Sequence, residues 1–495
     1  MKTSYNLSFI IYHLSFILLL ASCGAKEYVA TPIAESPAIM PDYRDVTMPL
    51  NIAAPTFALV DSLSLYDDVQ AVFVAGDKKV IVEDDADHGI CIDDADWKDL
   101  VAAAKGKITV TVQAKITSTQ DSSPNTQHLS PNTPISFKPF NIYISNDTID
   151  RYISYRLIEP GYEVWNKMGI YQRDVTSYIE QPILTNDASN GGCMNCHSYC
   201  NRDARTMSLH LRLECGGTYI TKNGKTTRLQ PKPSLVYPSW HPDGRYIAYS
   251  QNTTKQRFHT TDPNRIEVFD FNSDVVVYDT ETGNTLTSDN LNSKLKFETF
   301  PSWSADGKTL YFCCADSVLI PDDYDKVHYS LCSIAFDDKT GTFGNKVDTL
   351  YSASANNCSV SFPRESPDGR FLMFTRARYG NFSIWHKSAD LWLLPLSPNT
   401  HHPTPITPIN SPDVESYHTW SSTGRWVVFS SRRDDGLYTR LYITHCSPDG
   451  TFTKPFELPQ SDAHYYTRLM KSYNIPEFTI NAFTDNEVLK AAISE

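Results

Sequence analysis

The residues best suited to chemistry are the pentapeptide Cys193-Met194-Asn195-Cys196-His197. Two thiols separated by two residues can form thioether bonds to the vinyl groups along one edge of a porphyrin. The histidine that follows can offer an imidazole nitrogen to the iron. The motif therefore predicts one covalently attached haem c, with Cys193 and Cys196 as attachment sites and His197 as the proximal iron ligand.

Two other kinds of site use the same residue types. A Cys-x-x-Cys pair can be a redox disulfide, although the thioredoxin-like βαβ setting that would support one is missing. The motif can also be half of a zinc site that Cys200 or Cys215 completes together with His197. These two cysteines could instead form a local disulfide around the segment. The histidine directly after the second cysteine, together with the export signal described below, favours haem.

The segment that follows the motif alternates in polarity and offers candidates for the sixth iron ligand. As a strand it places Met207 on an apolar face, whereas His210 and Arg212 share the polar face. We rank His210 first as the distal ligand and Met207 as the alternative, followed by Met168 and His259. Arg212 is predicted to contact a haem propionate, because a guanidinium binds a carboxylate bidentately.

The N-terminus has the pattern of an export signal that ends in a lipidated cysteine. A positive charge at Lys2 precedes the apolar run 9–20, and Leu20-Ala21-Ser22-Cys23 has the small residues of a lipoprotein cleavage site. A membrane-spanning helix is the alternative, but the run is shorter than the roughly 20 residues that crossing requires. We therefore expect a signal peptide at 1–22, a lipid on Cys23 and a polar tether over 23–42, with the lipid as the sole membrane attachment.

The length and composition predict a folded, multidomain chain. Its 495 residues suggest two or three domains, and 41% hydrophobic with 20% charged residues is typical of globular proteins. The formal net charge of -13 makes nucleic acid an unlikely partner, because an acidic surface repels phosphate backbones.

A mainly β, sandwich-like domain is predicted over residues 43–150, without catalytic features. Runs rich in β-branched residues predict its strands, and a short helix closed by Gly106 is expected among them. The strands are expected at 69–75, 80–82, 108–116 and 135–144, and the helix at 97–105. Residues 151–205 form an aromatic segment that contains the haem motif, and could equally be a packing seam between domains.

A repeated strand, tight turn and strand unit marks residues 206–460 as a β-propeller. The turns carry Asp-Gly or Thr-Gly pairs, which supply the positive φ angles of a tight hairpin, and their glycines fall at 244, 307, 369 and 424. Because these spacings exceed those of ordinary blades, insertions or an unmarked blade must lie between them. We favour six blades over five, with Met207 to Arg228 in the first, and a C-terminal extension over 461–495.

The repeats resemble the WD40-like (PD40) repeats of TolB-type propellers. The whole arrangement resembles a family of Gram-negative lipoproteins often labelled cytochrome c-type or cytochrome c biogenesis proteins. Three further stretches share in this resemblance, namely 155–160, 250–259 and 473–478. The resemblance implies possession of haem rather than haem delivery, because delivery machinery usually needs membrane-spanning helices.

These features predict an outer-membrane-associated, mono-haem electron-transfer lipoprotein in the cell envelope, whose propeller docks an unidentified redox or envelope partner. The alternative is a propeller that binds a protein or glycan and in which haem is structural or sensory. A hydrolase is disfavoured, because no Gly-x-Ser-x-Gly motif occurs and few residues follow the last repeat.

Overall fold

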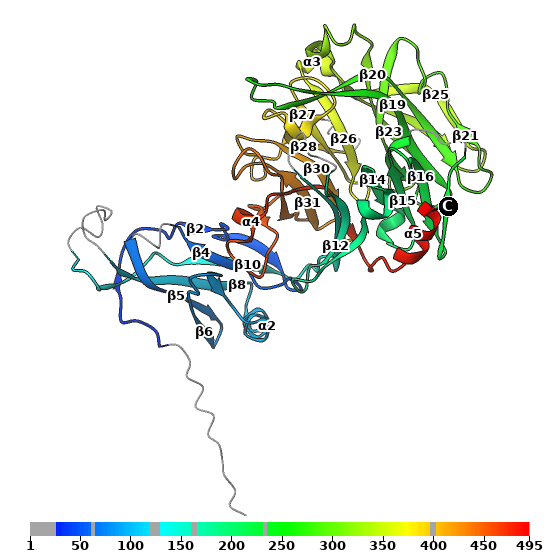
Figure 1. Cartoon of the computed structure of the whole chain (residues 1–495). Coiled ribbons are helices and arrows are strands. Elements are labelled where there is room, and N and C mark those ends of the chain that lie inside the picture. The colour runs from blue at the N-terminus through cyan, green and yellow to red at the C-terminus, as the bar shows by residue number, and fades with distance from the viewer. Residues whose placement is uncertain are drawn as a thin grey trace, which may run out of the picture.

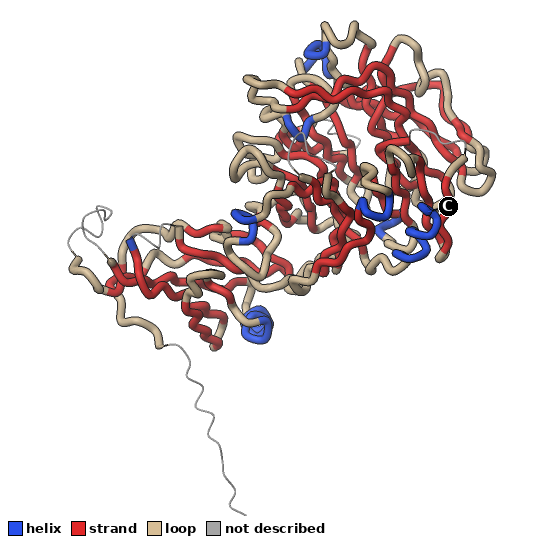
Figure 2. The backbone as a smooth tube through the Cα atoms, viewed as in Figure 1, coloured by secondary structure: helices blue, strands red, loops and turns tan. Residues whose placement is uncertain are grey.

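The computed structural model describes residues 26–60, 65–117, 129–159, 166–230, 235–396 and 402–494. The predicted signal peptide and Cys23 lie outside these residues. Figure 2 shows two parts, both dominated by strands, and Figure 1 shows the blue N-terminal part beside the larger propeller. Among the helices described, none has the length and apolar character needed to span a bilayer.

The N-terminal part is a two-sheet domain, as the sequence predicts, but it begins before residue 43. Residues 31–32 and 39–40, predicted to belong to the tether, pair with its strands. The larger sheet contains β1 (Thr31–Pro32), β3 (Val46–Pro49), β5 (Tyr66–Ala75), β6 (Lys78–Glu83), β8 (Lys107–Ile116), β9 (Pro134–Ser136) and β10 (Phe140–Ser145). The smaller sheet contains β2 (Ile39–Met40), β4 (Thr56–Leu59) and β7 (Ile90–Cys91). Phe57 of the smaller sheet packs against the larger one, since its ring centroid lies 6.3 Å from that of Phe73 and 6.2 Å from that of Phe140.

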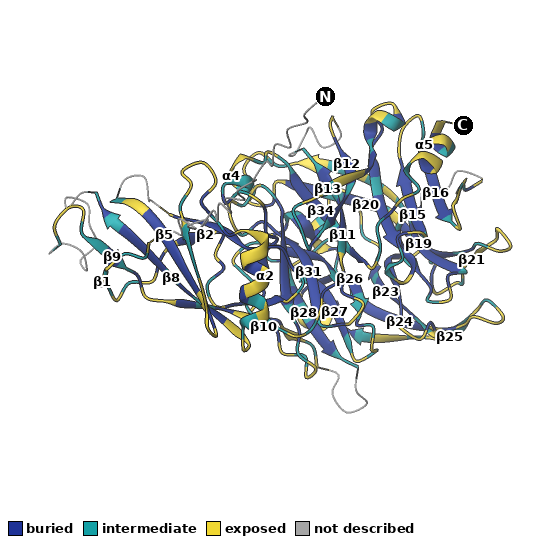
Figure 3. Ribbon diagram, turned by 90° about the horizontal axis from the view of Figure 1, so that it is seen from below, coloured by how far each residue is buried: buried dark blue, intermediate teal, exposed yellow. Residues whose placement is uncertain are grey.

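Two details of this domain differ from the sequence prediction. Helix α2 (Asp94–Ala103) begins and ends earlier than expected, and Figure 3 shows it largely exposed on the surface. The single strand predicted over 135–144 is interrupted between β9 and β10. Pro139 lies in the interruption, where it has no N–H to donate to a neighbouring strand.

Six four-stranded sheets form the propeller, which confirms the preferred blade count. Blade 1 contains β11 (Tyr152–Ile158), β12 (Gly169–Asp174), β13 (Glu180–Thr185) and β34 (Ser472–Thr479). Blade 2 contains β14 (Met194–Tyr199), β15 (Met207–Leu211), β16 (Gly217–Lys222) and β17 (Lys225–Arg228). Blade 3 contains β18 (Leu235–Trp240), β19 (Tyr246–Phe258), β20 (Ile266–Asp279) and β21 (Thr285–Leu286).

The other three blades follow in chain order. Blade 4 contains β22 (Lys296–Trp303), β23 (Thr309–Asp316), β24 (Ser330–Asp337) and β25 (Thr342–Tyr351). Blade 5 contains β26 (Ser359–Glu365), β27 (Phe371–Ala377), β28 (Asp390–Pro395) and β29 (Thr404–Pro405). Blade 6 contains β30 (Glu415–Trp420), β31 (Trp426–Ser431), β32 (Arg440–His445) and β33 (Phe456–Glu457). Short helices lie between or after strands: α3 (Ala353–Asn356), α4 (Tyr465–Arg468) and α5 (Asn486–Ser494).

The strand pairings extend the propeller at both ends beyond 206–460. Residues 152–185 supply three strands of blade 1, and β34 from the predicted C-terminal extension pairs antiparallel with β11 to complete it. Met207 to Arg228 therefore belong to blade 2 rather than to the first blade. The repeat could not mark blade 1, because its inner strand comes from the opposite end of the chain.

The extra length between repeats lies inside the blades, and the marked blades follow one another directly. The largest addition is the hairpin of β19 and β20, whose paired residues run from Tyr246 and Asp279 to Phe258 and Ile266. Figure 1 shows these long green strands reaching past their own blade.

The six inner strands share one irregularity. In each of them the pairing register shifts at a bulge, and one residue adopts a φ between 41° and 53°. These equivalent residues are Cys196, Tyr237, Phe300, Phe362, Tyr417 and Ile475. Their recurrence around the ring shows that the bulge is a feature of the blade, and that the second motif cysteine occupies one of its six positions.

Candidate functional site

The Cys-x-x-Cys-His motif lies on the innermost strand of blade 2, beside the central channel. Cys193 precedes β14 and Cys196 occupies the bulge of that strand. Arg156 of β11 holds the segment from the neighbouring blade, since its Nη1 donates to Met194 O at 3.0 Å and to Asn195 Oδ1 at 2.7 Å. The motif is thus fixed by strand pairing on one side and by a guanidinium on the other.

Both motif cysteines are free thiols and both are buried. Burial raises the pKa of the Cys196 thiol, so this thiol is protonated at neutral pH. Cys193 and Cys196 therefore retain the unpaired sulfur atoms that thioether formation requires.

His197 is 1% exposed, and neither of its ring nitrogens makes a hydrogen bond of normal geometry, although the backbone of Ser154 lies near enough to interact with the ring. Burial, aided by the nearby Arg156 charge, lowers the pKa of His197 to about 3, so the imidazole is neutral. His418 holds the same position after the bulge of blade 6, but its Nε2 lies 3.1 Å from Met373 O. A neutral imidazole with unused nitrogens has the chemistry of a metal ligand, and His197 differs from its structural counterpart in this respect.

A cavity of about 290 Å³, which we call the upper chamber, opens next to Cys193. This volume lies near the lower end of the roughly 300–1,000 Å³ typical of small-molecule sites. Its walls combine apolar and aromatic groups with three arginines. The wall includes Val236, Tyr237, Ile266, Val268, Phe382, Trp385, Tyr417 and Ile475, and the arginines are Arg156, Arg212 and Arg432. An apolar wall with cationic groups suits a flat apolar ligand that carries carboxylates.

The β19–β20 hairpin forms part of the wall of the upper chamber and is bound to blade 5. Glu267 of β20 lies 3.0 Å from His386 Nε2 and accepts a hydrogen bond from Tyr379 OH at 2.8 Å. Both Glu267 and His386 are buried. The hairpin therefore spans from blade 3 to blade 5 and partly covers the chamber.

Below the chamber the channel narrows at an aromatic collar, defined as Tyr237, Phe300, Phe362 and Tyr417. Successive ring centroids lie 4.5, 4.3 and 4.8 Å apart. A small space of about 30 Å³ at this level is bordered by Cys196 and His197. Tyr237, Tyr417 and Ile475 border both this space and the chamber, so the motif spans the junction between them.

The predicted distal ligands are not gathered at the chamber. His210 is buried within blade 2, where its Nδ1 lies 3.0 Å from Thr218 Oγ1, and Met207 packs in a hydrophobic core. His259 lies 4.0 Å from Glu267, near the contact of the hairpin with blade 5. Met168 does line the chamber, although its sulfur accepts a hydrogen bond from Met194 N at 3.4 Å. Arg212 lines the chamber and is exposed.

Neither alternative use of the cysteines is formed in the structure. Cys200 and Cys215 are free thiols that pack against different hydrophobic clusters, so the local disulfide does not form. Among the described residues, no group of three or more His, Cys, Asp or Glu side chains is arranged to hold a metal ion, so the alternative zinc tetrahedron is not assembled there.

Several channel residues were not singled out as site residues from the sequence. Arg432 carries no local pattern, because only the closure of the ring through blade 1 brings blade 6 to the same channel as blade 2. The three stretches quoted for the family resemblance did contain a signal, since each supplies residues to the upper chamber. These residues are Arg156, Ile158, Glu159, Asn252, Thr254, Gln256, Asn474 and Ile475.

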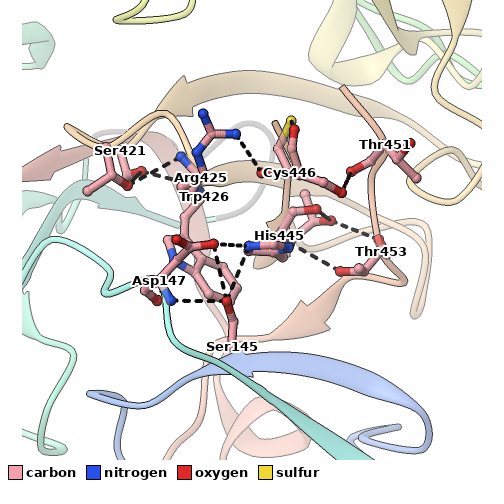
Figure 4. A network of polar contacts seen from close by, with 12 residues as sticks. Ser145, Asp147, Ser421, Arg425, Trp426, His445, Cys446, Thr451 and Thr453 are labelled. Carbon is pink, nitrogen blue, oxygen red and sulfur yellow. Dashed lines mark hydrogen bonds and ion pairs between the residues drawn. The ribbon is translucent and has the colours of Figure 1, made fainter. Parts of the chain in front are cut away.

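A Ser–His–Asp group lies outside the channel, where β10 and the loop after it meet blade 6 (Figure 4). His445 Nε2 is 3.3 Å from Ser145 Oγ and 2.7 Å from Asp147 Oδ2. A hydrolytic triad places serine and aspartate on opposite nitrogens of the imidazole, whereas here both approach the same one. Trp426 Nε1 also donates to Asp147 O at 3.1 Å, so the group fastens the N-terminal domain to the propeller.

Comparison with known proteins finds similar folds only. No family model and no curated relative matches the chain. TolB from Acinetobacter baumannii is 15% identical over 78% of this chain and 85% of its own, with a TM-score of 0.43. A hypothetical selenium-binding protein from Sulfolobus tokodaii is 10% identical over 67% of this chain and 94% of its own, with a TM-score of 0.41. The six sheets themselves therefore establish the propeller.

Proposed function

We propose that this chain is a mono-haem c-type protein that exchanges electrons with a partner in the cell envelope. Cys193 and Cys196 would hold the haem by thioether bonds, and His197 would be its proximal ligand. The observation that carries the proposal is the neutral, buried His197 imidazole, whose nitrogens make no hydrogen bond of normal geometry, next to two free thiols. Bound haem supplies a one-electron redox couple.

The residues around the motif fit this group. The aromatic and aliphatic wall of the upper chamber would exclude water from a porphyrin, and Arg156, Arg212 and Arg432 offer partners for its propionates. Met168 is the one predicted distal candidate on the chamber wall. We therefore move the distal proposal from His210 to Met168.

The rim of the chamber at blade 2 suits contact with a redox partner. Arg212 is exposed there, and the adjacent Leu213 is 69% exposed. An exposed apolar side chain beside a cation is suited to the small, transient interfaces of electron-transfer complexes. The lipobox at 20–23 supports attachment of the protein to the outer membrane by a lipid on Cys23.

The test is production of the full chain in a host that matures c-type haem. We expect one haem that stays bound on denaturation, with a matching mass increase and a reversible one-electron change in the visible spectrum. The Cys193→Ala, Cys196→Ala double variant should lose the haem, and Cys200→Ala, which removes a nearby buried thiol outside the motif, should keep it. Wild-type protein without covalent haem would contradict the proposal.

A further inference from the structure

The opposite end of the channel holds a second cavity of about 270 Å³, which we call the lower funnel. Residues that follow the bulges of the inner strands line it, whereas residues at or before the bulges line the upper chamber. The aromatic collar lies between the two spaces. The lower funnel shares no lining residue with the upper chamber, and it meets the small space beside His197 at Pro238, Arg364, Thr419 and Glu477.

Two arginines from distant blades face this compartment. Arg364 follows the bulge of blade 5, and its Nη1 donates only to Pro363 O at 3.1 Å. Arg202 follows β14, and its Nε donates to Trp420 O at 2.9 Å. In the described part of the chain neither guanidinium forms an ion pair, although burial lowers the pKa of both. Both side chains are half-buried, and Glu477 lies close enough for its charge to act on both of them. Because neither is held in a direct ion pair, their donors that face the lower funnel can bind an anion.

The acidic residues of the lower funnel limit the charge of that anion. Glu477 Oε2 accepts a hydrogen bond from Tyr199 N at 3.1 Å, and burial raises the pKa of Glu477 to about 7. Glu365 Oε1 accepts from Ala305 N at 3.1 Å, and burial raises its pKa as well. Two cations beside two carboxyl groups whose pKa values are raised by burial favour a monoanion over a doubly charged phosphate.

Two polar side chains on the wall of the lower funnel indicate which other groups the ligand should carry beside its anionic group. Glu365 Oε2 is buried and makes no hydrogen bond of normal geometry, although the Tyr311 hydroxyl also interacts with this carboxyl group. The indole Nε1 of Trp303, whose residue is 6% exposed, has no partner. The carboxyl oxygen can accept a hydrogen bond from a ligand N–H, and the indole N–H can donate one to a ligand oxygen. The anionic group itself is best matched by a carboxylate, because the paired N–H donors of an arginine guanidinium fit its two oxygens.

We propose that the lower funnel binds a carboxylate carried next to an amide or amine N–H, with Arg364 and Arg202 contacting the carboxylate and Glu365 accepting from the N–H. This chemistry occurs in the C-terminal residue of a peptide and in a free N-acyl amino acid. The inference does not depend on haem.

The experiment measures binding to the full chain by calorimetry. The probes are an acetylated tripeptide acid, the same tripeptide with a C-terminal amide, an N-acetyl amino acid and inorganic phosphate. We expect the tripeptide acid to bind at least about tenfold more tightly than the amide and the phosphate. Preference for the tripeptide acid over the N-acetyl amino acid identifies a chain end as the ligand, and equal binding identifies a small acid.

Variants assign the binding to this site. Arg364→Gln should weaken binding of the tripeptide acid at least about tenfold, whereas Arg378→Gln, an exposed arginine of the same blade, should not. If Arg364→Gln does not fold, Arg364→Lys keeps the charge but loses the forked geometry, and should also bind more weakly. The Cys193→Ala, Cys196→Ala variant should bind normally. Equal binding of acid and amide, no binding at millimolar concentration, or unchanged binding in both Arg364 variants would overturn the proposal.

Discussion

Replacing Asp270 by asparagine should make the propeller more stable relative to wild type as the pH rises. Asp270 lies on β20, is 5% exposed, and its Oδ2 accepts a hydrogen bond from Asn252 at 2.7 Å. Burial raises the pKa of Asp270 from 3.8 to about 7. Folded protein therefore keeps a proton that unfolded protein releases once the pH exceeds about 4.

The size of the effect follows from this shift. A rise of roughly three pKa units corresponds to about 4 kcal/mol of lost stability once the pH is above about 7, and about 3 kcal/mol of this loss develops between about pH 5 and about pH 8. Below about pH 4 the penalty vanishes, because the carboxyl group is protonated in both states. Asparagine has the same shape but no charge, so Asp270→Asn should escape the penalty.

The assay is denaturant unfolding of both proteins across this pH range, with the difference in unfolding free energy plotted against pH. That difference should move in favour of Asp270→Asn by about 3 kcal/mol from pH 5 to pH 8. Asp316→Asn, which removes an exposed carboxylate from the neighbouring blade, controls for the loss of charge. A difference that stays flat within about 1 kcal/mol, or that moves the other way, would refute the burial argument.

Three further predictions concern the hairpin, the ring closure and one turn. Glu267→Ala should speed amide hydrogen exchange in residues 252–268 at least about tenfold, because removing one partner of a buried pair costs about 3–5 kcal/mol. Glu281→Ala, at an exposed position, should not speed it. Unchanged exchange in Glu267→Ala would show that the Glu267–His386 contact does not hold the hairpin in place. Truncation after Lys471 removes β34 and should abolish cooperative unfolding, whereas truncation after Phe483 keeps that strand and should preserve it, as measured by circular dichroism. Gly307→Ala should lower stability by about 1–3 kcal/mol or more, since φ is +74° and the new Cβ would lie 2.2 Å from His241 Nε2. Gly424→Ala, where φ is +64° and the nearest atom would lie 3.4 Å from the new Cβ, should lower stability less. Equal losses of stability in the two variants would show that His241 moves to relieve its clash with the Cβ at position 307.

The fold was largely predictable, because its units are local. Each Asp-Gly or Thr-Gly turn joins two strands of one blade, so the sequence revealed four blades directly. Blade 1 was missed because β11 and β34 lie at opposite ends of the chain, and no local pattern records their pairing. The break between β9 and β10 could have been read from Pro139.

The candidate site was predictable only where it is contiguous. The motif names Cys193, Cys196 and His197 without reference to the fold. The distal candidates were chosen from their place on one strand, yet the bulge at Cys196 and the packing of neighbouring blades decide which side chains reach the channel. His210 consequently stays within blade 2, hydrogen-bonded to Thr218 of the next strand, and Met168 from blade 1 reaches the chamber instead.

The closure of the ring by β34 also sets an order of events during biosynthesis. β14, which carries the motif, lies between β34 and β18, yet residues 472–479 are made almost three hundred residues after Cys196. Until they arrive, the channel lacks the wall that Ile475 forms, and the thiols face an open gap. Any maturation chemistry at Cys193 and Cys196 has its best access in that interval, before the last strand encloses them.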